Sequence, residues 1–517
     1  MRILLMTDFS AARAFAAAGF APERCEEFGV YPRSVHREGA CVAFIWREES
    51  RDWLIASEGL GFTGRALDTP AGTLLAAPMN HENACVLRER FAFTAPVRVL
   101  KNARTAGTGD RLGIATPGHV RVFEQYDAYP ILAQQSMREL RLTGRTFEQV
   151  LDDVSYAVFR EDFRRGFGAD GDHLKTPEEV SYALSCGYTM ITLDCSEHIH
   201  AEEAGLTDEA VAERYTPDEA IEARYLGKRF PAGAYTLTFS PELLRRTCLI
   251  YKDAIDFAAS VYQRFLQDGA ADFEISIDET SAPTLPEQHF FIANELYLRG
   301  IRPVSVAPRF VGEFQKGIDY LGELAAFERD FAVHAAIADQ FGYKLSIHSG
   351  SDKFSVFPTI GKYTHGRFHL KTAGTSWLEA MAVVAEREPA LYREIHAFIL
   401  PDGFYKAAKY YHVTTNLDNI PPLSTVSDAE LARLLETNDD ERQLVHINYG
   451  LILNEKAPDG SYRFRDRLYR LWRQHENAYM QRLEHHIGRH LELLYSGFSA
   501  ENGQNDMQTA KKVGGTV

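Results

Sequence analysis

Short apolar or mixed segments alternate with longer segments of helical periodicity between about residue 110 and residue 415. The short segments have the length and composition of strands, and the longer ones place apolar residues three and four positions apart. This alternation is typical of βα units around a parallel sheet. Eight strands are predicted, which indicates an α/β fold with a closed (β/α)8 barrel of the TIM type: Leu112–Thr116, Phe167–Asp172, Thr189–Asp194, Phe273–Asp278, Pro303–Ala307, Lys344–Ser349, Phe368–Thr372 and Tyr411–Thr415.

Helix-start signals lie between several of these strands. Thr176 precedes Pro177 and Glu179, an order that combines an N-cap, a proline at the first helical position and a capping-box glutamate. Ser240 before a proline repeats the signal. Helical periodicity then predicts two helices that end near glycines, over Leu243–Gln267 and Tyr320–Gln340.

The pattern changes outside this region. Residues 1–108 contain strand-like runs over Val42–Trp46 and Trp53–Ala56 and are predicted to form a separate N-terminal subdomain. The barrel is expected over 109–496, with an acidic insertion at about 197–235 and a helical C-terminal extension. Residues 497–517 have almost no apolar content and are predicted to be a disordered tail.

Composition limits the classes of function. The chain of 517 residues has no apolar run of about 18 residues, so no membrane span is expected. Its net charge of −16 disfavours binding to nucleic acid or anionic lipid, so an anionic substrate would need a local basic cluster. Six cysteines without a CxxC pair argue against a zinc ribbon or a disulfide framework and fit a soluble cytoplasmic protein.

Polar residues at the ends of barrel strands are the first candidates for chemistry, because barrel enzymes act at the C-terminal face. Asp172 and His173 end one strand, and the pair can divide the work between proton transfer and metal binding. The alternative is that both residues cap the following helix. His348 ends another strand and leads into a Ser/Gly-rich loop in which Lys353 could pair with a carboxylate or phosphate.

Further candidates follow other strands. Alternation places Glu274 and Asp278 on one strand face, while Glu279 at the strand end could reach a ligand. Each of the three could instead form a structural salt bridge. On the next loop, Arg309 suits a sugar carboxylate. Oxygen ligands for a metal could come from Glu313 or Gln315, although an ordinary loop is the favoured interpretation of each alone. The rival ligand is His369 on the strand that also carries Lys371, for which a core position is the favoured interpretation.

Two further patterns resemble functional motifs but are not predicted to form functional sites. The GxGxxG match at residues 59–64 lacks a following helix and an acidic strand end, so no dinucleotide site is predicted. His486 and His490 lie one turn apart in a charged C-terminal helix, and this arrangement is typical of a solvated face.

The motifs GADGDHLK, EISIDET, APRFVGEFQKG and SIHSGSDKFSVFPTIGKYTHGRFHLKTAG resemble those of the bacterial tagaturonate epimerase family, which interconverts tagaturonate and fructuronate. The resemblance implies a divalent-metal enzyme (Zn, Mn, Fe, Co or Ni) acting on a small sugar acid. It implies that Asp172 is the proton acceptor and that His173 and His348 are metal ligands, with Gln315 as the third. The proton donor would be Glu274 or Glu279. Arg309, Lys353 or Lys371 would hold the substrate carboxylate.

The chemistry of this interconversion narrows the mechanism. The inverted carbon lies β to the ketone, so its C–H bond is not acidified and an enolate cannot explain the inversion. Without a nucleotide site, retro-aldol cleavage and recondensation is the expected route. Two other classes compete with this interpretation: a metal-dependent ketose isomerase or class II aldolase-like enzyme on a related sugar or sugar phosphate, and a non-catalytic sugar-binding protein.

Overall fold

The structure is a computed structural model that describes residues 7–280, 282–400 and 402–499. Its centre is a closed barrel of eight strands, in which all neighbouring strands are parallel. In chain order the strands are β6 (Arg104–Gly107), β7 (Tyr129–Ser136), β8 (Gly168–Leu174), β9 (Met190–Asp194), β12 (Asp272–Ile277), β13 (Ser305–Pro308), β14 (Lys344–Ile347) and β15 (Phe368–Lys371). The predicted barrel is confirmed.

Six of the eight predicted strands are present, and two predictions are wrong. Leu112–Thr116 is a turn, because the Asp110 carboxylate accepts hydrogen bonds from the N–H groups of Leu112, Gly113 and Ala115 at 2.9, 2.8 and 2.6 Å. Tyr411–Thr415 is a loop beside the barrel mouth. Their places are taken by β6 and β7, so the barrel begins before residue 109.

Helices surround the barrel, and their ends follow the sequence signals. Thr176 and Ser240 accept the capping hydrogen bonds of α7 (Pro177–Ser185) and α10 (Pro241–Val261). Helix α12 (Leu324–Phe341) is followed by the C-cap Gly342, whose φ is 79°. The surrounding helices are α4 (Thr116–Gln125), α5 (Met137–Thr143), α6 (Phe147–Arg160), α7 (Pro177–Ser185), α10 (Pro241–Val261), α11 (Pro286–Leu298), α12 (Leu324–Phe341) and α13 (Phe357–Tyr363).

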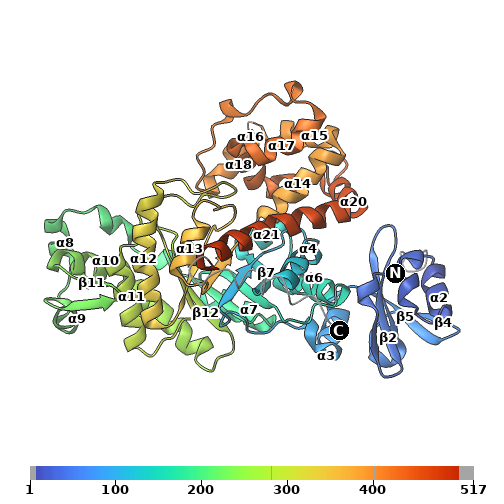
Figure 1. The fold of residues 1–517 in the computed structure, drawn as a ribbon, viewed down its shortest axis with the longest axis horizontal. Helices are drawn as coiled ribbons and strands as arrows, with labels where there is room; N and C mark the ends of the chain where they lie inside the picture. The colour runs from blue at the N-terminus through green and yellow to red at the C-terminus, as the bar shows by residue number, and fades with distance from the viewer. Residues whose placement is uncertain (1–6, 281, 401, 500–517) are drawn as a thin grey trace.

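The N-terminal subdomain is an antiparallel sheet of five strands in the order β1-β2-β3-β5-β4, with one apolar cluster on each face. Its elements are α2 (Ser10–Ala17), β1 (His36–Glu38), β2 (Cys41–Arg47), β3 (Asp52–Ser57), β4 (Arg65–Thr69), β5 (Gly72–Pro78) and α3 (His81–Arg90). Figure 1 shows this sheet on the opposite side of the barrel from the insertion. The insertion contains α8 (Asp208–Arg214), α9 (Glu219–Tyr225) and a hairpin of β10 (Arg229–Ala232) and β11 (Tyr235–Thr238).

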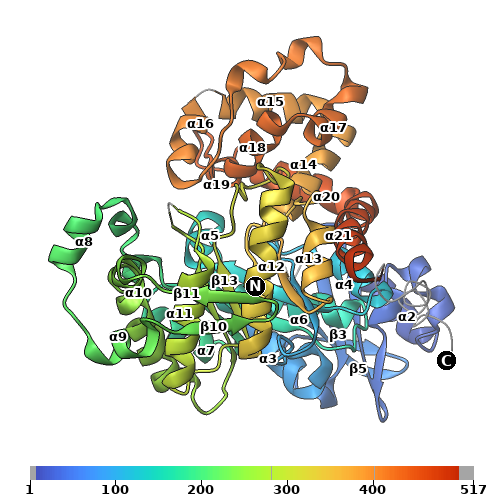
Figure 2. The same cartoon turned by 60° about the vertical axis from the view of Figure 1, so that its left-hand side comes forward.

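The C-terminal extension is helical, as predicted, and forms a layer of its own above the barrel (Figure 2). Its helices are α14 (Thr375–Arg387), α15 (Pro389–Ile399), α16 (Asp402–Ala407), α17 (Asp428–Thr437), α18 (Asp439–Ile447), α19 (Tyr449–Asn454), α20 (Arg465–Gln474) and α21 (Glu476–Ser499). Helix α21 returns to the barrel and packs against α13 and α4. Residues 497–499 of the predicted tail belong to α21, and residues 500–517 lie outside the described residues.

No helix in the described part of the chain combines the length and apolarity needed to cross a bilayer. The cysteines at positions 25, 41, 85, 186, 195 and 248 are all free.

Candidate active site

Two adjoining cavities of about 320 and 310 Å³ open at the C-terminal ends of the barrel strands. The two cavities share six of their lining residues: Arg138, His173, Glu279, Lys316, His348 and Ser349. Asp278 and Arg309 border the first cavity, and Asp172, Asp194 and Lys371 border the second. Residues from seven parts of the chain therefore meet at the place where a barrel enzyme binds its substrate.

His173 lies at an irregularity of strand β8. The pairing of β8 with β9 shifts register between Gly171 and Leu174, and His173 has a φ of 51°. Such a bulge redirects a side chain, and here it brings the imidazole to the cavity. His173, Asp194 and Glu279 each offer one ligand atom, and these atoms lie within 4.8 Å of one another.

The charges around His173 favour a cation. Its Nδ1 lies 3.6 Å from Asp194 Oδ2, and both atoms are buried without a hydrogen bond. Burial alone would lower the pKa of His173, but the Asp172 and Asp194 carboxylates raise it to about 10. The same carboxylates would attract a divalent cation, which takes the place of the proton on the imidazole when it binds.

Below the mouth, the ammonium of Lys371 joins three buried carboxylates. It lies 2.6 Å from Asp172 and 2.9 Å from both Asp170 and Glu274. Burial alone would raise the pKa of Asp172, but Lys371 lowers it below its ordinary value. Burial dominates at Asp170 and raises its pKa to about 7. Asp172 is thus held ionised at the edge of the cavity.

His348 stands between two of the predicted carboxylates. Its Nε2 is 2.8 Å from Glu274 and its Nδ1 is 3.0 Å from Asp278. Its ring packs edge-on against the ring of His173, with 4.9 Å between centroids. Glu274 is fully buried and borders neither cavity, whereas Glu279 borders both.

Three residues predicted to bind the substrate or the metal are instead bound to other protein groups: Lys353, Arg309 and Gln315. The Lys353 ammonium is buried and donates to the carbonyls of Gln315, Ile318 and Ser351 at 2.8, 2.5 and 2.8 Å. Lys353 therefore fixes the loop backbone and borders neither cavity. Arg309 borders one cavity, but its guanidinium donates to the Thr280 carbonyl and pairs with Glu313.

The Gln315 side chain also binds other protein groups and does not border the cavities. Its Oε1 accepts from the Thr414 N–H, the Thr414 hydroxyl and Gln443 Nε2 at 3.1, 3.0 and 3.0 Å. His369, the rival ligand, is a core residue whose Nδ1 lies 2.9 Å from the Thr105 hydroxyl. Neither residue borders the mouth cavities.

Sequence analysis missed Asp194, Arg138 and Lys316. Asp194 ends a correctly predicted strand, so the rule that selected Asp172 also applies to it. Arg138 follows β7, a strand that was not predicted. Lys316 belongs to a loop whose other polar residues received more weight.

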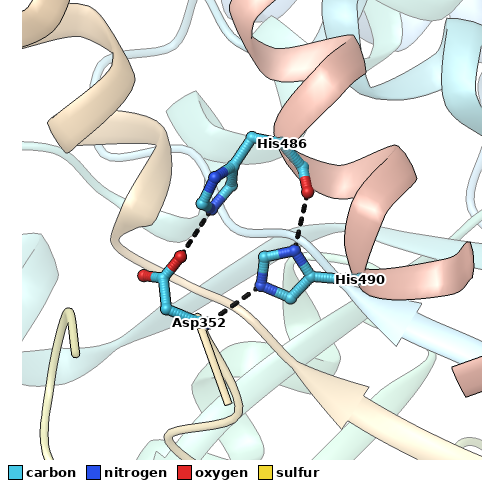
Figure 3. Close-up of side chains that lie close together, drawn as sticks. All are labelled: Asp352, His486 and His490. Carbon is cyan, nitrogen blue, oxygen red and sulfur yellow. Dashed lines mark hydrogen bonds and ion pairs between the residues drawn. The ribbon is translucent and has the colours of Figure 1, made fainter. Parts of the chain in front are cut away.

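The prediction of a solvated face for His486 and His490 is wrong. Both are buried, and Figure 3 shows them against Asp352 in the loop that follows β14. His490 Nε2 accepts the Asp352 N–H at 2.9 Å, and its Nδ1 donates to the His486 carbonyl at 2.7 Å. The Asp352 carboxylate pairs with Arg442 at 3.0 Å and with His486 at 3.3 Å. Backbone groups thus occupy both nitrogens of His490, and the contact ties α21 to the loop that begins at His348.

A closed parallel barrel with imidazole, carboxylate and ammonium groups gathered at its C-terminal mouth is the architecture of (β/α)8-barrel enzymes. A family model described as tagaturonate epimerase matches residues 31–494. The tagaturonate/fructuronate epimerase of Thermotoga maritima is 41% identical over 478 residues, which cover 90% of this chain and 97% of that protein. The chain belongs to the tagaturonate epimerase family.

Solved structures of the fructuronate-tagaturonate epimerase from Cohnella laeviribosi share the fold. The native structure is 49% identical and covers 93% of this chain and 99% of that chain, with a TM-score of 0.88. The complex with one glycerol is 48% identical with the same coverage and TM-score.

Proposed function

We propose that this chain interconverts D-tagaturonate and D-fructuronate at the barrel mouth, by metal-assisted retro-aldol cleavage and recondensation. The observation that carries the proposal is the group of His173, Asp194 and Glu279, which opens onto a cavity that Asp172 also lines. Membership of the tagaturonate epimerase family supplies the substrate.

The donor set suits a divalent cation of the Zn, Mn, Fe, Co or Ni group, which binds imidazole and carboxylate ligands. His173 and Asp194 would hold it, and their two buried atoms without hydrogen bonds support this choice. His348 lies against His173 and would add a second imidazole, with Glu274 orienting its ring. When bound, the metal polarises the ketone and stabilises the charge that develops on its oxygen.

The protein side chains move the protons. Asp172 accepts the proton of the hydroxyl on the carbon β to the ketone. The bond between the α and β carbons breaks, and its electron pair forms an enediolate. The aldehyde fragment turns, the carbon–carbon bond forms again on the other face, and the new alkoxide takes a proton from Glu279. Asp172 then releases its proton to water and Glu279 takes one up, which restores both side chains. Glu279 is favoured over Glu274 because it borders both cavities.

The test uses tagaturonate in D2O with the purified protein, with and without a divalent metal. NMR should show fructuronate only with metal and no deuterium at the inverted carbon. Deuterium placed on that carbon should give no primary isotope effect, because its C–H bond never breaks. Deuterium incorporation, a primary isotope effect, net release of fragments or formation of an aldose contradicts the proposal.

A further inference from the structure

Most cations at the mouth are already committed to protein carboxylates or carbonyls. Lys371 binds three carboxylates, and Arg309 binds Thr280 and Glu313. Lys175 pairs with Asp194 at 3.5 Å. These side chains balance charge that the protein itself supplies, and they leave no net positive charge for an anionic ligand.

Lys316 and Arg138 are different. Both border both cavities, and neither forms an ion pair within the described part of the chain. The Arg138 guanidinium donates to the Tyr410 carbonyl at 3.2 Å and lies over the Tyr411 ring. The Lys316 side chain is partly buried. A lysine that is partly withdrawn from water without a partner carries a desolvation cost that an anion can offset.

A third cation lies near Lys316 but is already paired with a carboxylate. Arg111 is buried behind the mouth, where it pairs with Glu139 at 2.9 Å and keeps Nη1 without a hydrogen bond. Burial lowers the pKa of Lys316, and Arg138 and Arg111 lower it further, while the Glu139 and Glu279 carboxylates oppose them. Arg141 is the other lining cation without an ion pair among the described residues, but it is exposed and borders one cavity only.

We infer that Lys316, with Arg138 beside it, binds the carboxylate of the sugar acid and so keeps the aldehyde fragment in the site while it turns. The inference rests on the proposed function. The carboxylate lies at the far end of the carbon chain from the ketone. Once the carbon–carbon bond breaks, the aldehyde fragment carries the carboxylate and the enediolate fragment carries the former ketone. An anchor at the carboxylate is then the contact that prevents the charged fragment from leaving.

Equilibrium binding tests the subsite without turnover. Calorimetry on protein supplied with Mn²⁺ compares galactonate with galactitol, which have the same length but differ in charge. Lys316→Ala should weaken galactonate binding roughly 10- to 100-fold, the range of a charge-assisted hydrogen bond, and leave galactitol binding unchanged. Lys316→Arg should restore most of the affinity. Lys406→Ala, which removes an exposed lysine of α16, is the matched control.

Kinetic measurements test whether Lys316 keeps the aldehyde fragment in the site. Lys316→Ala should raise the KM for tagaturonate by a similar factor and release a three-carbon aldehyde acid that a hydroxylamine trap detects, which the wild type does not release. Wild-type protein that binds no galactonate, or equal galactonate affinity in wild type and Lys316→Ala, overturns the inference. A wild type that binds galactonate but leaves tagaturonate unchanged contradicts the proposed function and not the subsite.

Discussion

The Lys371 ammonium lies 2.6 Å from Asp172 Oδ1, and both side chains are buried. Lys371 comes from the last barrel strand and Asp172 from the third, so the pair spans the barrel. This ion pair explains how an acidic side chain can stay ionised at a buried strand end. It also fixes the carboxylate at the edge of the cavity.

Replacing Lys371 by methionine should destabilise the protein by about 3–5 kcal/mol, because three buried carboxylates lose their common cation. Urea unfolding at pH 7 measures the loss. The double variant Lys371→Met/Asp170→Asn should recover part of it, since one carboxylate is removed with the cation. Wild-type stability in Lys371→Met would show that the cluster is not charged as described.

Asp172→Asn and His173→Ala should separate proton transfer from metal binding. Asp172→Asn should keep bound metal and lower kcat roughly 100- to 10,000-fold, the contribution of a general base. His173→Ala should lose both metal and turnover. Metal analysis of the purified variants and NMR of the reaction are the measurements. Loss of metal in Asp172→Asn would make that carboxylate a ligand.

Glu279→Gln tests whether the exposed Glu279 carboxylate at the mouth returns the proton or binds the metal. If Glu279 returns the proton, the variant should keep its metal and lose at least about 100-fold in kcat with little change in KM. Glu274→Gln should instead lower stability, because Glu274 bonds to Lys371, His348 and Ser305 in the core. Metal loss in Glu279→Gln would assign this carboxylate to the metal.

The sequence predicted the fold more fully than the site. Strand β9 was legible as an apolar run that ends in Asp194, β14 as a short apolar run that leads into His348, and β12 by its alternation of apolar and polar residues. Strand β6 is four residues with little apolar character, and β7 passes into α5 at Ser136 without a loop. Because β7 was not predicted, Arg138 was not recognised as a residue that follows a barrel strand. Lys353 and Gln315 could not be placed, since their partners Ile318, Thr414 and Gln443 lie on loops and helices whose positions follow from tertiary packing.

His490→Ala should loosen the loop that begins at His348. The variant leaves the buried Asp352 N–H without an acceptor, which costs about 1–3 kcal/mol. Thermal unfolding should show the loss, and hydrogen exchange at residues 349–353 should be faster. His485→Ala is the control, because His485 is exposed one residue from His486. Unchanged exchange in His490→Ala would show that α21 does not hold this loop.

Glu476 should make the docking of the N-terminal subdomain dependent on pH. Its carboxylate binds Arg160 of α6 at 2.5 Å and Arg47 of β2 at 2.6 Å. Burial alone would raise the pKa of Glu476, but Arg160 lowers it below the ordinary 4.5. Because the folded-state pKa is the lower one, this ion pair stabilises the protein above pH 4.5 and is lost as pH falls through the folded-state value.

Glu476→Gln should therefore lower the free energy of unfolding by about 1–3 kcal/mol at pH 7 and by less at pH 4. Urea unfolding of wild type and variant at pH 7, 5.5 and 4 gives the difference, which should shrink as the wild-type carboxylate takes up its proton. Glu26→Gln, at an exposed position, should leave the pH dependence unchanged. The contrary result is a difference in the free energy of unfolding between wild type and Glu476→Gln that stays constant from pH 7 to pH 4. Such a result would mean that Glu476 acts through its shape and hydrogen bonds and not through its charge, because the amide would then be an equally poor replacement for the charged and the protonated carboxyl group.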